Sequence, residues 1–206
     1  MIANADMSAD DLLDWAIDAA RSKTIEIERP EILSMLRAKI QSDPSDGEAH
    51  HALAFAIYHL WREIPSERLV EALAACRRAQ DLLDDREWAE LCEVYLQWCA
   101  KSPVGCVVAC GRVDREFFRE SPSWGWRAIS VDEVEFASLV ELRMGRDRVA
   151  ILAEEIVRAA VQEQVGMFPF EPLIFLRALP SASEIGFVSA SDAERFRSSL
   201  SATGGA

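Results

Sequence analysis

The sequence predicts an all-α fold in which antiparallel helical hairpins pack on one another. Helix-start signals recur along the chain: a Ser or Asp is followed three residues later by an acid, and the pair can satisfy the first free amides of a helix. The connections between these segments are mostly short, which makes consecutive helices antiparallel neighbours. Alternation typical of a strand is confined to two brief stretches, 24–28 and 131–136.

Five helices are expected in the first half of the chain, over residues 8–21, 31–41, 45–62, 67–83 and 84–100. Ser8, Ser45 and Asp84 are the expected caps, each with an acid three residues on. Pro30 and Pro65 mark the other two starts, because proline is favoured in the first turn of a helix.

The second half is expected to hold helices over residues 104–118, from Ser130 to a stop at Gly145, over 149–160 with a stop at Gly166, and from Ser191 onward. Two stretches rich in Pro, Gly and aromatic residues, 120–127 and 165–172, interrupt this pattern. We therefore expect a helical-hairpin array over 1–119, a C-terminal helical portion packed on it over 120–200, and a disordered tail over 201–206.

The charge balance selects among partners. The chain has 206 residues, with 22 basic and 35 acidic side chains and a formal net charge of −13. Such a charge repels nucleic-acid phosphates and anionic membrane surfaces and favours a basic protein or peptide. No apolar run approaches the length of about 18 residues needed to span a membrane, and the acidic N-terminus does not resemble a signal peptide. Five cysteines without a CxxC pair predict buried thiols in a cytoplasmic protein.

A repeat of helical pairs is visible in the middle of the chain. Trp88, Leu91, Cys92 and Tyr95 follow the pattern W-x2-L-small-x2-Y, and 38 residues earlier the same places hold His50, Leu53, Ala54 and Ile57. The small residues Ala72, Cys76 and Ala79 fit the second helix of such a pair. Over roughly residues 31–119 the chain resembles the tetratricopeptide repeat (TPR) family, and a generic helical bundle is the alternative reading.

The resemblance implies a module that binds another protein in a groove lined by the first helix of each hairpin. Carried over position by position, that groove is lined by Glu48, His51, Phe55, Tyr58 and His59, and then by Arg86, Ala89, Glu93, Leu96 and Gln97. TPR domains that clamp a terminal carboxylate place Lys and Asn here, and neither is present. Trp124 and Trp126, expected on a loop, are secondary contact candidates.

No catalytic residue, metal or cofactor is expected. His51 and His59 are separated by eight residues, or about 12 Å along a helix, which is too far to share one ion. Glu48 and His51 form only half of a carboxylate-bridged di-metal motif. The chain contains no GxxxxGK[ST], strand-borne GxGxxG, HExxH or GxSxG sequence.

The sequence thus predicts a protein–protein interaction module with a basic partner, and not an enzyme. A dedicated neutraliser such as an immunity protein, antitoxin or secretion chaperone is the alternative, since it would cover one partner tightly. An enzyme or metalloprotein built on Glu48, His51 and His59 is a third possibility.

Overall fold

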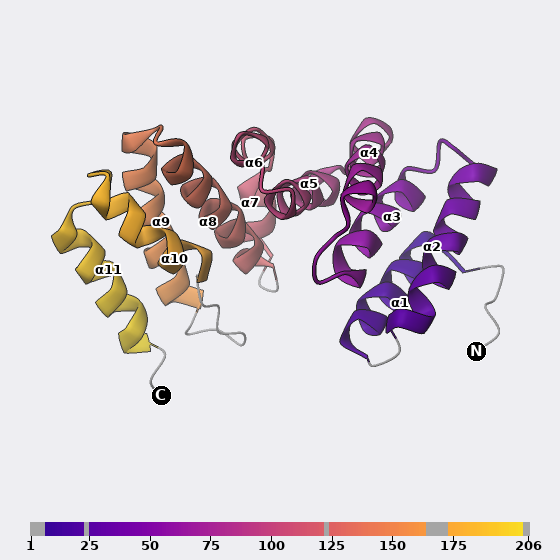
Figure 1. The fold of residues 1–206 in the computed structure, drawn as a ribbon, viewed down its shortest axis with the longest axis horizontal. Coiled ribbons are helices and arrows are strands. Elements are labelled where there is room, and N and C mark those ends of the chain that lie inside the picture. Colours follow the sequence, from indigo (N-terminus) through magenta and orange to yellow (C-terminus); the bar gives the residue numbers. More distant parts are fainter. Residues whose placement is uncertain (1–6, 23–24, 122–123, 164–172, 204–206) are drawn as a thin grey trace. The chain divides into compact units, whose positions relative to one another are not determined.

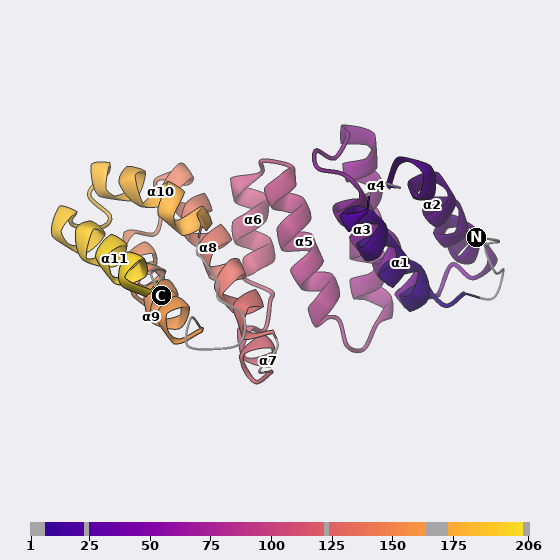
Figure 2. The same ribbon diagram turned by 90° about the horizontal axis from the view of Figure 1, so that it is seen from below.

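The computed structural model describes residues 7–22, 25–121, 124–163 and 173–203, and these residues form eleven helices and no strand (Figures 1 and 2). The prediction of an all-α protein is therefore confirmed. The chain divides into two compact units, Met1–Lys101 and Ser102–Ala206, each with its own apolar core. This division lies 18 residues before the expected one between 119 and 120. No described helix is both long and apolar enough to cross a membrane.

The first unit is organised around one central helix. Its elements are α1 (Ala9–Arg21), α2 (Ile25–Ser42), α3 (Gly47–Leu60), α4 (Ser66–Leu82) and α5 (Glu87–Cys99). α3 contacts all four of the others, and α4 and α5 also contact each other (Figure 1). Four buried alanines in α3 allow this close approach on several sides, because their methyl groups take little room; they are Ala49, Ala52, Ala54 and Ala56.

Of the three Ser or Asp caps expected in this unit, one agrees with the structure and two differ. Ser8 caps α1, and its side chain and that of Asp11 form the expected capping box. The cap of α3 is Asp46 rather than Ser45: Asp46 accepts the Ala49 amide at 2.9 Å. Ser45 is engaged by the Asp43 carboxylate instead. α5 begins at Glu87, with no side-chain cap from Asp84.

α2 begins six residues before its expected start, so that Pro30 lies inside the helix. The first turn is held by tertiary contacts that the local sequence does not encode. The Trp15 indole of α1 donates to the Glu28 carboxylate at 2.9 Å, and the Arg29 guanidinium lies 4.4 Å from the centre of the Trp61 ring. These contacts offset the one backbone hydrogen bond that Pro30 removes.

The second unit also has one central helix. It comprises α6 (Pro103–Cys110), α7 (Arg115–Arg119), α8 (Gly125–Leu142), α9 (Arg146–Glu163), α10 (Leu173–Glu184) and α11 (Ala190–Thr203). α8 contacts α6, α7, α9 and α10, and α11 packs on α9 and α10. The core includes three phenylalanines that contact in series, Phe136, Phe175 and Phe196.

Several boundaries of this unit differ from the prediction. The expected helix over 104–118 is two helices, because the chain turns at Gly111 and Asp114 caps α7. α8 starts at Gly125 instead of Ser130, whose hydroxyl donates to the Arg127 carbonyl within the helix. Gly145, with φ of 66°, does separate α8 from α9 as expected.

The C-terminal end shows one unexpected helix. α10 was not anticipated, and it contains Pro180. α11 continues to Thr203, three residues into the expected tail; residues 204–206 lie outside the described residues. The whole aromatic-rich stretch 165–172, with the expected stop at Gly166, lies outside them too.

Candidate interaction site

The α3 residues expected to bind a partner form a continuous row of rings, which we call the aromatic row: His51, Phe55, Tyr58 and His59. Phe55 meets the His51 ring edge-on at 5.0 Å and stacks on His59 at 5.7 Å between ring centres. Tyr58 meets His59 at 5.1 Å. Residues three and four apart share a helix face, which explains the contacts from Phe55 to its neighbours.

The aromatic row continues onto the next hairpin through Tyr95 of α5. Its ring stacks on Tyr58, with 5.3 Å between ring centres and 19° between planes. Tyr58 and His59 are partly exposed, whereas Phe55 is only 4% exposed and belongs to the core. Phe55 is therefore the buried member of the row, which corrects its expected place on an open groove.

Acidic side chains from three elements surround the N-terminal end of the row. They are Asp10 of α1, Asp46 and Glu48 at the start of α3, and Asp85 between α4 and α5, and we call them the acidic rim. Partial burial raises the pKa of Glu48, and the nearby charges of Asp10, Asp46 and Asp85 raise it further. Among the described residues, no cation forms an ion pair with any of the four.

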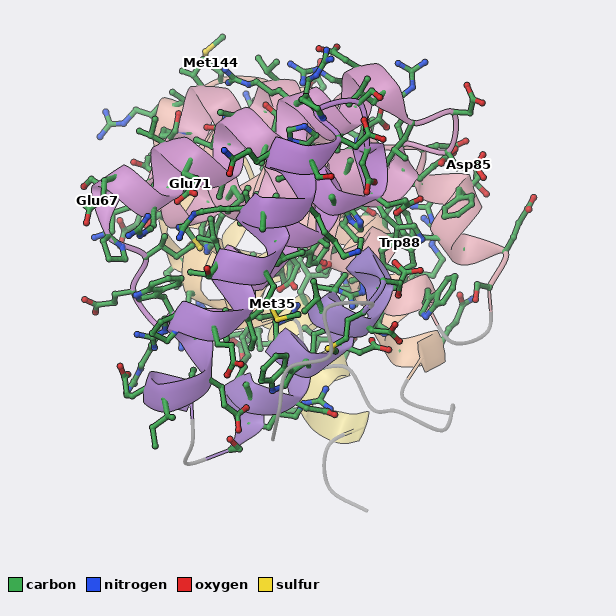
Figure 3. The ribbon with its side chains drawn as sticks, turned by 90° about the vertical axis from the view of Figure 1, so that its right-hand side faces the viewer. Met35, Glu67, Glu71, Asp85, Trp88 and Met144 are labelled. Carbon is green, nitrogen blue, oxygen red and sulfur yellow. The ribbon has the colours of Figure 1, made fainter. Side chains whose placement is uncertain are left out.

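The acidic rim differs from other acids of the same unit. Figure 3 places Asp85 and Trp88 on one side of this unit and Glu67 and Glu71 on the other. Glu71 is neutralised by Arg37 and Arg68, at 2.7 and 2.9 Å. The rim thus carries unbalanced negative charge, while the Glu71 carboxylate is already engaged within the fold.

His51 lies at the junction of the rim and the row. Burial lowers the pKa of its imidazole to about 4, although the Asp10 charge opposes this. Its Nε2 atom is buried and makes no hydrogen bond to any described residue. The ring is therefore neutral at neutral pH and acts as an aromatic surface, not as a cation that would balance the rim.

The α5 residues expected in the groove are mostly turned inward. Glu93 is 2% exposed, accepts a hydrogen bond from Gln80 of α4 at 3.0 Å and lies 3.5 Å from the Arg77 guanidinium. Gln97, Ala89 and Leu96 are buried as well. Only Arg86 is exposed, and it lies 3.9 Å from Glu90. The packing of α5 on α3 and α4 takes up this face, so the expected two-helix groove reduces to the α3 side.

Trp124 and Trp126, expected on a loop, belong to the second unit; Trp124 lies in the turn before α8, whereas Trp126 lies inside that helix. Trp124 is the N-terminal cap residue of α8 and is 42% exposed, while Trp126 lies within the first turn. The Arg127 guanidinium sits 4.0 Å from the centre of the Trp126 ring. Trp124 is thus a surface aromatic beside a helix start, and Trp126 is partly covered.

The residues considered for metal or thiol chemistry are dispersed. The described part of the chain holds no group of three His, Cys, Asp or Glu side chains arranged to bind a metal ion. Cys76, Cys92, Cys106 and Cys110 are buried as expected, but Cys99 is exposed. Burial raises the pKa of the Cys92, Cys99 and Cys110 thiols, which disfavours the reactive thiolate.

The sequence reasoning missed four members of this site: Tyr95, Asp46, Asp10 and Asp85. Tyr95 is a repeat position, and stacking of adjacent hairpins could have placed it beside Tyr58. Asp46 directly follows the expected cap Ser45. Asp10 and Asp85 are distant in sequence from α3, so only the packing of α1 and of the α4–α5 connection brings them to Glu48.

These features define an all-α protein of packed helices with an acidic and aromatic surface on its first unit. No protein-family model, curated protein or solved structure matches the chain at a significant level.

Proposed function

We propose that the first unit is a protein-binding module and that the α3 side receives a basic, partly apolar segment of another protein. The observation that carries this proposal is the acidic rim, four carboxylates with no paired cation among the described residues, at the N-terminal end of an aromatic row in which His51, Tyr58 and His59 are partly exposed. Aromatic and acidic groups side by side suit Arg and Lys, because the rings take the aliphatic stem and the cation while the carboxylates take the charge.

The arrangement of helices supports a TPR-like stack as the scaffold. α3 contacts the preceding pair, α1 and α2, and also α4 and α5, which is what the first helix of a middle hairpin does in such a stack. In this proposal the repeat covers α2 to α5 of the range 31–119, and α6 and α7 belong to the second unit. The five free cysteines agree with a reducing, cytoplasmic location.

Substitutions that remove the carboxylate charge but keep the side-chain shape test the binding face. We would titrate the protein with a synthetic amphipathic peptide of Arg and Leu, and with its Glu and Leu counterpart, at about 50 mM and about 300 mM salt. We expect only the cationic peptide to bind, and more weakly at high salt. The triple variant Asp10→Asn, Glu48→Gln, Asp85→Asn should lose about ten-fold or more in affinity.

The matched control carries the same change in net charge at exposed acids elsewhere, Glu67→Gln, Glu141→Gln and Glu184→Gln. Its affinity should change less than about two-fold. Equal losses in the two triple variants would show that the peptide responds to the overall charge and would refute the site.

Tyr58→Ala separates the aromatic contribution from the charge. Removing the ring should weaken the cationic peptide by about ten-fold, as truncation of an interface aromatic typically does. Circular dichroism and the unfolding midpoint would verify that the helices are retained. Unchanged affinity in a folded Tyr58→Ala protein would remove the aromatic row from the proposal.

A further inference from the structure

Glu133 of α8 is a buried acid that caps a different helix. It is 3% exposed, and its Oε1 accepts a hydrogen bond from the Phe175 amide at 2.9 Å. The Ile174 amide also hydrogen-bonds to this carboxylate. Ile174 and Phe175 are the second and third residues of α10, whose amides have no partner within the helix. A side chain 42 positions earlier thus supplies the N-terminal cap of α10.

Glu133 differs from the acids on either side of it, which are paired with arginine. Asp132 is bound by Arg115 and Arg119 of α7, and Glu135 by Arg115 and by Arg148 of α9. No cation of the described residues pairs with Glu133. The remaining titratable or charged groups on the helices packed against α8 are Cys106 and Cys110 of α6, Glu116 of α7, Glu155 and Arg158 among those of α9, and Arg177 and Glu184 of α10. None of them has a resolved effect on Glu133.

α10 seals the carboxylate from water. Phe175, Leu179 and Ala182 on its inner face are fully buried. The Phe175 ring lies 4.9 Å from Phe136 of α8 and 6.2 Å from Phe196 of α11, centre to centre. Separation of α10 from α8 would therefore break this aromatic contact and expose Glu133 to solvent in one step.

We propose that Glu133 makes the docking of α10 on α8 dependent on pH, with α10 held most firmly when the carboxyl is protonated and loosened toward alkaline pH. The proposal depends on the arrangement of these groups: the Glu133 carboxyl has no cation partner among the described residues and is covered by α10, the helix that it caps. A charged carboxylate confined in this apolar surrounding favours any opening that hydrates it.

The direction follows from proton linkage. Burial raises the pKa of Glu133 to about 7, and the hydrogen bonds from the Phe175 and Ile174 amides lower it only in part. In the undocked state the pKa of the group returns to its ordinary value of 4.5. Between these two values the docked state binds a proton that the undocked state lacks, so docking weakens as pH rises through this window. Above about pH 7 both states are ionised and the dependence levels off.

Hydrogen exchange of the full chain measures this opening. We would follow peptides covering 173–184 between about pH 5.5 and about pH 8, with rates corrected for intrinsic chemical exchange. The opening constant of α10 should rise about twenty- to thirty-fold over this range. Peptides from α1, whose cap is the exposed pair Ser8 and Asp11, serve as the internal control and should not follow this rise.

Glu133→Gln is the matched variant, since it keeps the shape and one amide-accepting oxygen but cannot ionise. In this variant the hydrogen-exchange protection of α10 should not change with pH. The neighbouring acid Asp132 and its ion pairs are left intact. If the opening constant of α10 rose with pH by the same factor in Glu133→Gln, the proposal would be overturned. Simultaneous opening of all helices of the second unit would also overturn it. Where the variant does not fold, the carbon-13 carboxyl shift of Glu133 in the native protein decides: a midpoint near 7 supports the device and one below about 5 overturns it.

Discussion

The two units are built alike and use their acids in opposite ways. Each has one central helix that contacts four others, α3 in the first unit and α8 in the second. Residues 1–101 carry 20 acidic and 11 basic side chains, a formal charge of −9, while residues 102–206 carry 15 and 11, a formal charge of −4. The acids around α3 lie at its surface without cations, whereas those of α8 lie inside and hold neighbouring helices.

The difference follows from the composition of the two central helices. α3 is rich in alanine and apolar residues, so its polar groups remain at the edge beside the aromatic row. α8 carries acids at 132, 133 and 135. Positions 132 and 135 are three residues apart, share a helix face and both bind Arg115, whereas position 133 points in another direction and reaches α10. Asp132 binds α7, Glu133 caps α10, and Glu135 joins α7 to α9. An acidic composition therefore does not by itself indicate a binding surface.

The largest expected effect is on the core of the second unit. Phe175→Ala removes a fully buried ring in contact with Phe136 and Phe196 and should lower the free energy of unfolding by about 4 kcal/mol. Hydrogen exchange should report the loss in α8 to α11. Leu173→Ala, at an exposed position of the same helix, is the control and should change stability little. Equal effects of the two substitutions would contradict the buried position of α10.

Breaking the ion pairs of α8 should come next. Arg115→Met leaves the buried Asp132 carboxylate and Glu135 with fewer cations, and we expect a loss of about 3 kcal/mol in chemical denaturation. Arg195→Met removes an equally short but exposed pair with Glu154 and should have no measurable effect. An unchanged free energy of unfolding in Arg115→Met would mean that the acids of α8 do not stabilise the packing of α7 and α9 on it.

The pH responses of the units should differ in sign. Because burial lowers the pKa of His51 to about 4 from its ordinary value of 6.5, the unfolded state binds more protons between these values, and the first unit loses stability as pH falls. We expect a loss of about 2 kcal/mol near pH 5. Exchange of α3 amides would measure it, and His51→Leu should abolish it. Acid sensitivity that persists in His51→Leu would assign it to another group.

The smallest effect concerns the start of α3. Asp46→Ala should cost about 1 kcal/mol, because the Ala49 amide loses its acceptor, whereas Ser45→Ala removes only a contact within the turn. Thermal unfolding of the two variants compares the candidate caps directly. A greater cost for Ser45→Ala would restore the cap expected from the sequence.

This last comparison shows how far local sequence reasoning reaches. Ser45 with Glu48 fits the capping-box pattern, but Asp46, one residue later, is also a favourable cap residue, and it caps α3 while Ser45 is engaged by Asp43. For the site, the sequence placed His51, Tyr58 and His59 on one helix face. It could not show that Glu93 is buried against Gln80, because that depends on how α5 packs on α4.

By itself the sequence determined that the chain is helical, roughly where most helices lie, and that it is strongly acidic, because periodicity, capping and charge are local properties. The tertiary structure decided which acids remain at the surface without ion pairs and which are bonded to neighbouring helices. It joined Asp10 and Asp85 to Glu48, and it joined Glu133 to the start of a helix 42 residues later in the chain. Contacts of this kind depend on the packing of whole helices, which no short segment of the chain encodes.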